Sequence, residues 1–245
     1  MIQSDQIRVS VAMAVYNSEK YIKPQIDSII KQLGNNDELV ISYNDSIDNT
    51  WNIINEYANQ DNRVKIFKCD EKGLLPNFNS AISHSRGKII FLSDHDDIWL
   101  DKKVEKVIDV FEKENSILVL HGRFVVDADL NVIKEVTYQN FKPKFFRNLI
   151  KNSFLGAGMA FKSEMKKYIC PIPQKNIYHD AWIGLWCSLL GKVSIINEPL
   201  MLYRRHEGNL SVTVRRKFYI ILLERFSTLV EIIKRLFVIF FVRKL

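Results

Sequence analysis

The chain has 245 residues, of which 47% are hydrophobic and 26% are charged, and its formal net charge is +7. This composition predicts a globular protein with one sizeable core. The three cysteines, Cys69, Cys170 and Cys187, are too few and too scattered for a disulfide framework or a cysteine metal site, which favours a reducing compartment.

The positive charge is concentrated at one end. Residues 215–245 contain eight basic and two acidic side chains, so this tail carries +6 of the net charge of +7. The rest of the chain is nearly neutral, which argues against a nucleic-acid partner. The first residues lack a basic segment followed by an apolar core and a cleavage site, so we expect no secretory signal and a cytoplasmic location.

Hydrophobic periodicity predicts an α/β protein. In the first half, strands alternate with helices, which indicates a largely parallel central sheet with helices on both faces. We expect strands at 8–15, 38–43, 64–68 and 88–92, helices at 21–33, 51–58 and 78–85, and a loop at 73–77. In the second half we expect a hairpin within 116–133 at the sheet's edge, helices at 145–150 and 180–190, and strands at 155–164 and 193–196.

Three carboxylates follow the buried strand that ends near Leu92. Asp94, Asp96 and Asp97 repel one another unless a cation lies among them, and oxygen ligands suit Mg²⁺ or Mn²⁺. Open α/β sheets also place their ligands at the carboxyl ends of strands. The simpler alternative is that Asp97 or Asp101 only caps the helix that begins near Lys102.

The other polar loops support a nucleotide site without a phosphate-binding glycine loop. Tyr16 and Asn17 follow the first strand, and NDSIDNT at 44–50 follows the second. Neither G-x-G-x-x-G nor G-x-x-x-x-G-K-[ST] is present. Further along, YHDAW at 178–182 and LYRRHEGN at 202–209 add Asp180 as a candidate base and His206 as a candidate metal or phosphate ligand. Helix capping by Asp180 and a plain surface role for His206 are the alternatives.

Six segments together carry a family resemblance. SVAMAVYNSEKYIKPQIDSI, ISYNDSIDNT, IIFLSDHDDIWLDKK, GAGMAF, HDAW and LYRRHEGN occur in the order and approximate spacing found in family 2 glycosyltransferases. The chain resembles these inverting enzymes of the GT-A fold over roughly residues 8–212. The late HDAW and YRxHxxN segments look most like those of bacterial rhamnosyltransferases and other enzymes that build O-antigen or capsule.

The resemblance implies a role for each matching residue. The nucleotide would lie against Ala14, Tyr16, Asn17, Asn44, Asp45, Asp94 and Arg204. Asp96 would be the principal ligand of Mg²⁺ or Mn²⁺, helped by Asp94 and His206, and Asp180 would be the catalytic base. Sugar and acceptor would contact Asp97, Trp99, Gly156, Ala157, Gly158, His179 and Trp182.

The implied reaction moves a sugar from a UDP- or dTDP-linked donor to a hydroxyl of a glycan or lipid-linked acceptor. The nucleotide-binding half would span about 1–115 and the acceptor half about 116–212. One departure from the family pattern bears on the donor, because Tyr43 and Asn44 replace an acidic pair that would recognise the base. A non-catalytic binding or scaffold protein is the alternative that this loss favours.

The tail at 213–245 has the pattern of a basic amphipathic helix. Its apolar residues recur every three or four positions, at Leu222, Phe226, Leu229, Ile233, Leu236 and Phe240. The longest apolar run, 236–242, is shorter than the ~20 residues that span a bilayer. We therefore expect the tail to lie on the inner face of the cell membrane, with packing on the catalytic domain or homodimer formation as alternatives.

Overall fold

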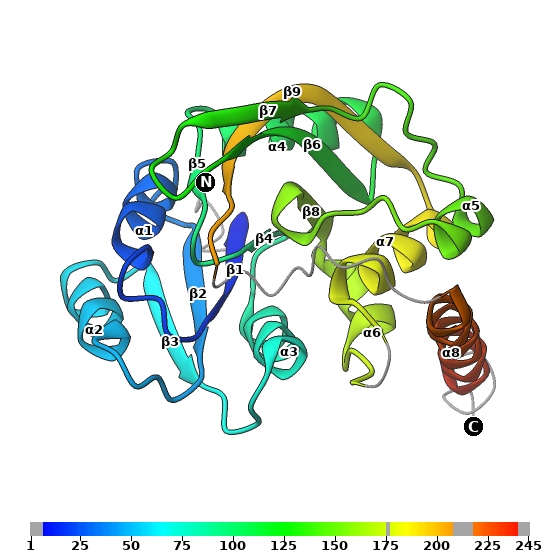
Figure 1. Ribbon diagram of the computed structural model, residues 1–245, viewed down its shortest axis with the longest axis horizontal. Coiled ribbons are helices and arrows are strands. Elements are labelled where there is room, and N and C mark those ends of the chain that lie inside the picture. The colour runs from blue at the N-terminus through cyan, green and yellow to red at the C-terminus, as the bar shows by residue number, and fades with distance from the viewer. Residues whose placement is uncertain (1–6, 175–176, 208–217, 240–245) are drawn as a thin grey trace, which may run out of the picture.

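The computed structural model describes residues 7–174, 177–207 and 218–239, and within them nine strands form one curled sheet flanked by helices (Figure 1). The strand order is β3-β2-β1-β4-β8-β6-β9-β5, with β7 paired to the outside of β6. The strands are β1 (Val9–Val15), β2 (Glu38–Tyr43), β3 (Val64–Lys68), β4 (Ile89–Ser93), β5 (Ile98–Trp99), β6 (Leu118–Val126), β7 (Val132–Val136), β8 (Met159–Lys162) and β9 (Val193–Arg204).

The helices cover both faces of this sheet. They are α1 (Ile22–Ile30), α2 (Thr50–Gln60), α3 (Leu74–His84), α4 (Lys103–Glu114), α5 (Phe145–Ile150), α6 (Lys166–Ile169), α7 (His179–Leu190) and α8 (Phe218–Phe237), with short 3₁₀ turns at Gly156–Gly158 and Ser163–Met165. The helix predicted at 78–85 begins earlier, at Leu74, and includes Pro76. Proline is tolerated there because the first turn of a helix does not use that backbone N–H.

The sheet is parallel only in part. Strands β3, β2, β1 and β4 run parallel, as the alternation of strands and helices predicted. Strand β8 then pairs antiparallel with both β4 and β6, so the sheet as a whole is mixed. Because β8 starts beside the carboxyl end of β4, the Gly156–Gly158 turn that precedes it lies next to the Asp94 loop.

The second half corrects two predictions. The hairpin of β6 and β7 forms, but β6 lies inside the sheet between β8 and β9, and only β7 is on the outside. The strand predicted at 193–196 continues to Arg204. Pro199 has no N–H for the ladder, so the register shifts between Ile196 and Pro199, but pairing with β6 then resumes and the strand does not end.

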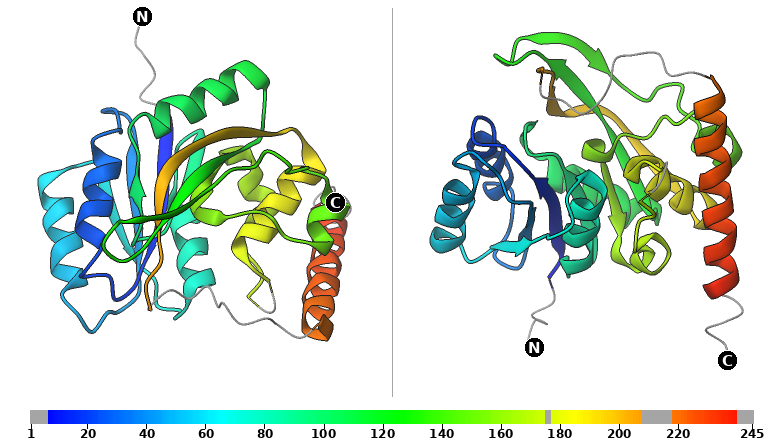
Figure 2. Two further views of the ribbon diagram at one scale, coloured as in Figure 1. Left: turned by 45° about the horizontal axis from the view of Figure 1, so that its top comes forward. Right: turned by 60° about the horizontal axis from the view of Figure 1, so that its bottom comes forward.

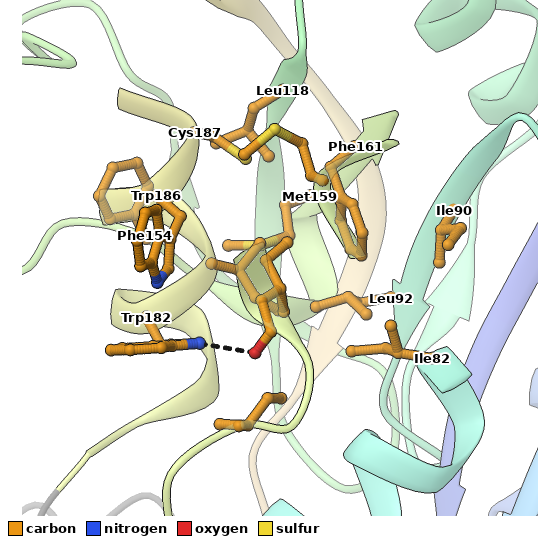
Figure 3. Close-up of a cluster of buried hydrophobic side chains, with 14 of the residues drawn as sticks. Ile82, Ile90, Leu92, Leu118, Phe154, Met159, Phe161, Trp182, Trp186 and Cys187 are labelled. Atoms are coloured by element: carbon orange, nitrogen blue, oxygen red, sulfur yellow. Dashed lines mark hydrogen bonds between the residues drawn. The ribbon is translucent and has the colours of Figure 1, made fainter. Parts of the chain in front are cut away.

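Alternate residues of the central strands build a core on each face of the sheet. In β4, Ile90 and Leu92 join the cluster on the α3 and α7 side, whereas Ile89 and Phe91 join the cluster on the α1 and α4 side. Figure 3 shows the first cluster, in which Trp182 and Trp186 of α7 face β4 and β8. Burial on both faces explains why these strands read as continuous apolar runs.

Helix α8 packs against the rest of the protein beside α5, α6 and α7 (Figure 2). Its inward stripe includes Glu224, Thr228 and Ile232, and Arg235 donates hydrogen bonds to the carbonyls of Tyr168 and Ile169. Of the apolar side chains that define the predicted amphipathic face, Leu222, Phe226 and Ile233 are exposed, whereas Leu236 packs on the core. Two parts of the predicted tail, residues 213–217 and the end from Phe240, lie outside the described residues.

The described helices include none that combines the length and apolarity a bilayer crossing requires. One face of α8 packs on the protein, as the packing alternative predicted, whereas the opposite face is exposed and mainly apolar.

Candidate active site

A cavity of about 910 Å³ opens at the carboxyl ends of the parallel strands. Its walls come from the loops after β1, β2, β3 and β4 and from the segment after β9. The lining residues are Ala14, Tyr16, Asn17, Glu19, Lys20, Tyr21, Asn44, Asp48, Lys72, Gly73, Leu74, Asn77, His95 and His206. Four residues that the sequence predicted for a nucleotide site, Ala14, Tyr16, Asn17 and Asn44, therefore share one cavity.

The loop after β1 is held in place by the loop after β2. Asn17 has a positive φ of 45°, and its side-chain oxygen accepts a hydrogen bond from the Ile47 backbone N–H at 3.0 Å. The backbone N–H groups of Asn17 and Ser18 in turn donate to Ser46 Oγ and Thr50 Oγ1. These contacts fix the shape of the cavity while leaving the Tyr16 ring about half exposed at its rim.

Asn44 shapes the cavity by holding another loop. Its amide nitrogen donates to the carbonyls of Cys69 and Glu71, at 2.7 and 2.9 Å, and its amide oxygen accepts from the Gly73 N–H. The side chain is therefore engaged by the 69–73 loop, which brings Lys72 and Gly73 to the cavity wall. Asp45 lies outside the cavity lining, with its carboxylate 3.1 Å from Lys68 Nζ, so its predicted contact with a base stays a prediction.

The three carboxylates after β4 do form one cluster. Asp94, Asp96 and Asp97 each offer an oxygen within 4.8 Å of the others. Burial, followed by the nearby charges of Asp96 and Asp180, raises the pKa of Asp94 to about 7. Burial and the charges of Asp96 and Asp94 likewise raise the pKa of Asp97 well above its usual value. So much crowded negative charge is stable only with a cation nearby or with bound protons.

His206 meets this cluster from the far end of the chain. Its Nε2 lies 2.9 Å from Asp96 Oδ2, and its ring stacks on Tyr21 with ring centroids 4.5 Å apart. The Arg204 guanidinium also lies over the Tyr21 ring, 4.8 Å from its centroid. Tyr21, the first residue of the helix predicted at 21–33, therefore contacts both residues through its ring.

Asp97 and Arg204 are both buried, and hydrogen bonds connect the loop that contains Asp97 to the end of β9. Asp97 Oδ1 accepts the Arg204 backbone N–H at 3.0 Å, and Arg204 donates from its side chain to the carbonyls of Asp96 and Ala128. These contacts anchor the end of β9 to the acidic loop. Neither residue lines the cavity, so the direct contacts with nucleotide or substrate predicted for them stay predictions.

The capping alternative for the acidic loop does not hold. Helix α4 begins at Lys103 without a side-chain cap, and Asp101 instead pairs with Lys31 at 2.7 Å. Asp97 accepts from Arg204, as described above. The carboxylates after β4 are therefore not explained by helix capping.

Lys103 is a site residue that the sequence reasoning missed. It is 1% exposed, its Nζ donates to the Ala157 carbonyl at 3.2 Å, and it lies 3.9 Å from the centroid of the Trp99 ring. Burial lowers the pKa of Lys103 to about 7, although the charges of Asp97 and Asp94 favour the protonated form. A lysine directly after an aspartate-rich loop was the available signal, and only its burial distinguishes it from the exposed Lys102.

The Gly156–Gly158 turn lies behind this lysine and is fully buried. A Cβ at Gly156 would lie 2.4 Å from His179 Nε2, so only glycine permits the close approach of that ring. His179 stacks on Phe78 with centroids 4.3 Å apart, and burial lowers its pKa. Neither the turn nor His179 lines the cavity of about 910 Å³, so both lie behind its wall.

Asp180 is in the first turn of α7, beside the acidic cluster. Its Oδ2 accepts a hydrogen bond from Asn152 Nδ2 at 3.3 Å, and its Oδ1 accepts from the Ala181 backbone N–H. The helix begins after Tyr178 with no side-chain cap, so Asp180 is not an N-cap. Its charge contributes to the raised pKa of Asp94, which places the two carboxylates in one electrostatic environment.

Trp99 and Trp182 lie in the hydrophobic core, away from any surface that a substrate reaches. Trp99 is 1% exposed among the α1 and α4 residues, and Trp182 is fully buried, with its Nε1 donating to the Ile169 carbonyl at 2.9 Å (Figure 3). Their size and apolarity account for this placement. The predicted substrate contacts of these two rings find no support in the structure.

The chain matches known proteins over most of its length. The sequence profile of glycosyl transferase family 2 matches residues 10–167. The chain belongs to this family. WfgD from Escherichia coli, "UDP-Glc:alpha-D-GlcNAc-diphosphoundecaprenol beta-1,3-glucosyltransferase", is 30% identical to this glycosyltransferase over 199 residues, which cover 79% of this chain and 74% of WfgD.

Solved structures support the fold of this family 2 glycosyltransferase. S. aureus TarS 1–349 in complex with UDP-GlcNAc superposes with a TM-score of 0.71 at 19% identity, covering 94% of this chain and 72% of TarS. The mannosyltransferase PcManGT from Pyrobaculum calidifontis, in complex with GDP-Man and Mn²⁺, gives a TM-score of 0.61 at 18% identity, covering 93% of this chain and 63% of PcManGT. The family 2 glycosyltransferase therefore has the GT-A fold that the sequence predicted.

The acidic cluster of this glycosyltransferase fits a divalent metal ion. Asp94, Asp96 and Asp97 supply oxygens, and His206 supplies a nitrogen beside Asp96. Burial and then the neighbouring carboxylates raise the pKa values of Asp94 and Asp97. Hard oxygen donors of this kind suit Mg²⁺ and Mn²⁺. Of the four, Asp97 is the most enclosed, because one of its oxygens already accepts the Arg204 N–H.

Proposed function

We propose that this glycosyltransferase moves a sugar from a nucleoside diphosphate sugar to a hydroxyl of a lipid-linked acceptor, with inversion at the anomeric carbon. The observation that carries the proposal is that the Gly156–Gly158 turn packs against both β4, which leads into the acidic loop, and His179 at the start of α7. This packing supports a site that combines Asp180 with the acidic cluster, and the charge of Asp180 contributes, after burial and the charge of Asp96, to the raised pKa of Asp94. The nucleotide would occupy the cavity of about 910 Å³ next to them.

Asp180 is the proposed general base. It takes the proton from the acceptor hydroxyl, whose oxygen forms a bond to the anomeric carbon of the donor. The bond from that carbon to the diphosphate oxygen breaks on the opposite face, and the nucleoside diphosphate leaves with the electron pair. Asn152 orients the carboxylate through its hydrogen bond to Oδ2. Attack opposite to the leaving group inverts the anomeric configuration.

Asp96, with Asp94 and His206 beside it, would hold Mg²⁺ or Mn²⁺. When bound, such an ion supplies electrostatic stabilisation of the negative charge that develops on the diphosphate. Tyr21 and Arg204 keep His206 and the end of β9 next to Asp96. The PcManGT complex with GDP-Man and Mn²⁺ is a precedent for a metal in this fold.

The proposed donor is a UDP- or dTDP-linked sugar. The TarS complex holds UDP-GlcNAc, and the name of WfgD gives UDP-Glc as its donor and a diphosphoundecaprenol-linked sugar as its acceptor. The rhamnosyl donor expected from the motifs belongs to the same proposal. We place the reaction in the synthesis of bacterial O-antigen or capsule, where sugars are added to lipid-linked intermediates.

Thermal unfolding of the full chain with UDP-glucose, UDP-GlcNAc and dTDP-rhamnose, each with and without Mn²⁺, tests donor binding. We expect one donor to raise the unfolding temperature only with the metal. Asp180→Asn should keep this shift while transfer falls by about 10²- to 10⁴-fold, and Asp109→Asn, on the exposed side of α4, is the matched control. No shift with any donor, in wild type and Asp96→Asn alike, contradicts the enzyme proposal. Donor binding without any transfer supports a non-catalytic binding protein instead.

We also propose that α8 attaches the protein to the cytoplasmic face of the membrane. Its outward face carries large exposed apolar side chains, among them Tyr219, Leu222, Leu223, Phe226, Ile233 and Phe237. The segment that contains this helix holds most of the net positive charge, which is attracted to anionic lipid headgroups. Apolar burial combined with such attraction is how helices lie in the headgroup plane.

Flotation with vesicles of phosphatidylglycerol and phosphatidylcholine tests this attachment. Phe226→Ser should weaken binding to the anionic vesicles, whereas Ile133→Ser, which removes an equally exposed apolar side chain from β7, should not. Analytical ultracentrifugation of the same proteins measures their oligomeric state and so tests the dimer alternative. A wild-type dimer that ignores vesicles at low salt and becomes monomeric in Phe226→Ser would replace the membrane proposal.

A further inference from the structure

A second cavity, of about 390 Å³, is lined mainly by the loop that joins β7 to α5. Strand β6 forms its floor through Arg123, and the loop and α5 form its walls. The lining residues are Arg123, Val136, Thr137, Tyr138, Gln139, Asn140, Phe141, Lys142, Arg147 and Ser153. None of them lines the larger cavity, so the two are separate sites among the described residues.

The charge of this cavity is of one sign. Arg123, Lys142 and Arg147 contribute three basic groups, and no acidic side chain is among the lining residues. The Tyr138 hydroxyl is buried beside the Arg123 side chain, whose Nε has no hydrogen-bond partner in the part of the chain that is described. A buried N–H donor without a partner is costly, and an oxygen of a bound anion would satisfy it. The cavity is therefore suited to a phosphate or diphosphate group.

The cavity adjoins the proposed base. Ser153 in its wall directly follows Asn152, whose Nδ2 donates to Asp180 Oδ2, and α5 packs against α7. The Tyr138 hydroxyl also lies within the electrostatic reach of Asp180 and Arg123. Asp180 is thus connected through Asn152 to the wall of the basic cavity, and its charge also contributes to the raised pKa of Asp94 in the acidic cluster. This is where an acceptor, and not the donor, is expected.

An apolar surface continues outward from the cavity. Phe146 and Ile150 are one turn apart on α5 and are each 75% exposed, on either side of Arg147 in the sequence. Helix α5 packs on α8, whose outward face is also apolar. A basic cavity beside an apolar surface matches a molecule with an anionic head and a hydrocarbon chain.

We propose that this cavity binds the diphosphate of a lipid-diphosphate-linked acceptor, with Arg123, Tyr138 and Arg147 contacting the phosphate oxygens. The first part of the lipid chain lies on Phe146 and Ile150, which leaves the acceptor sugar beside Asp180. This inference rests on the proposed function and specifies its acceptor class. Arginine is well suited to the task because its planar guanidinium donates two parallel hydrogen bonds to phosphate.

Equilibrium dialysis of labelled farnesyl diphosphate against the full chain tests the site without knowledge of the acceptor sugar. Wild type should bind it, and Arg147→Gln and Lys142→Gln should each weaken binding by about tenfold. Both side chains are exposed, so these variants should fold normally. Lys144→Gln and Lys151→Gln remove exposed lysines that do not line the cavity, and these two variants should bind like wild type.

Competitors identify which chemistry the cavity recognises. Farnesol and inorganic pyrophosphate should compete poorly, because each lacks one half of the ligand, and the donor identified by thermal unfolding should not compete at all. Displacement by the donor, or equal loss of binding in the Lys151→Gln control, overturns the proposal. Displacement by phosphatidylglycerol vesicles at matched phosphate concentration would reassign the cavity to membrane headgroups. Because donor binding is measured separately, a failure of this acceptor site is distinguishable from a failure of the glycosyltransferase proposal.

Discussion

His206 Nε2 lies 2.9 Å from Asp96 Oδ2, which joins the segment after the last strand to the loop after β4. This contact closes one side of the proposed donor site, because His206 also lines the cavity of about 910 Å³. Tyr21 supports it by stacking on the imidazole ring. The arrangement of the acidic cluster with His206 therefore depends on three segments that are distant in the sequence.

Asp96→Asn should separate metal binding from folding. Replacing this carboxylate removes a negative charge that raises the pKa values of Asp94 and Asp97, so the metal-free variant should unfold at the same temperature as wild type or higher. The Mn²⁺-dependent increase in unfolding temperature should disappear. Asp101→Asn, in the same loop but exposed and paired with Lys31, should keep the Mn²⁺ response. An unchanged Mn²⁺ response in Asp96→Asn would show that the ion binds elsewhere.

Metal binding should strengthen as pH rises toward about 7 and above. Without metal, the folded-state pKa of Asp94 is raised to about 7, above its usual value near 4. Between these values the folded protein binds more protons than the unfolded chain, so this group's contribution to stability falls as pH rises through that window. A metal ion must displace the same proton. Titration calorimetry with Mn²⁺ at pH 6 and pH 8 should give tighter binding at pH 8, and the reverse order would contradict the assignment.

Gly156→Ala should destabilise the protein. The new Cβ would lie 2.4 Å from His179 Nε2, and the ring cannot move freely because it is buried and stacked on Phe78. Overpacking of this kind costs about 1–3 kcal/mol of unfolding free energy. Gly158→Ala is the matched control in the same turn, because its Cβ would meet its nearest atom at 3.4 Å. Urea unfolding of the two variants measures the difference, and equal stability would mean that His179 adjusts.

Lys103→Met should damage both stability and the site. The ammonium group is buried and donates to the Ala157 carbonyl. Its positive charge also lowers the pKa values of Asp94 and Asp97. Removal of the ammonium group leaves the buried Ala157 carbonyl without this donor, which typically costs about 1–3 kcal/mol. Lys102→Met, one residue earlier and exposed, should have little effect on unfolding in urea. Mn²⁺ should restore part of the stability of Lys103→Met, since a bound cation compensates the same carboxylates.

Local patterns were sufficient for most of the fold. The parallel half follows from strands and helices whose apolar spacing is set by which faces they bury. Residues 88–92 read as a buried strand for that reason, and β4 spans Ile89–Ser93. The edge position given to β6 was wrong because strand order depends on pairings between segments far apart, which periodicity does not encode. The same limit applies to β9, whose pairing resumes after Pro199.

The acidic loop and the candidate base could be found from the sequence alone, because carboxylates at the end of a strand and in an HDAW segment are local chemical signals. Their association was implied only by the family resemblance, because local signals do not encode how α7 packs beside β4. Tertiary structure also assigned Trp99 and Trp182 to the core, made Lys103 a buried partner of the acids, and turned Leu222 and Phe226 of α8 outward. A side chain's type limits the chemistry it can perform, but burial and neighbours decide which of those roles it has. Only the folded chain determines them.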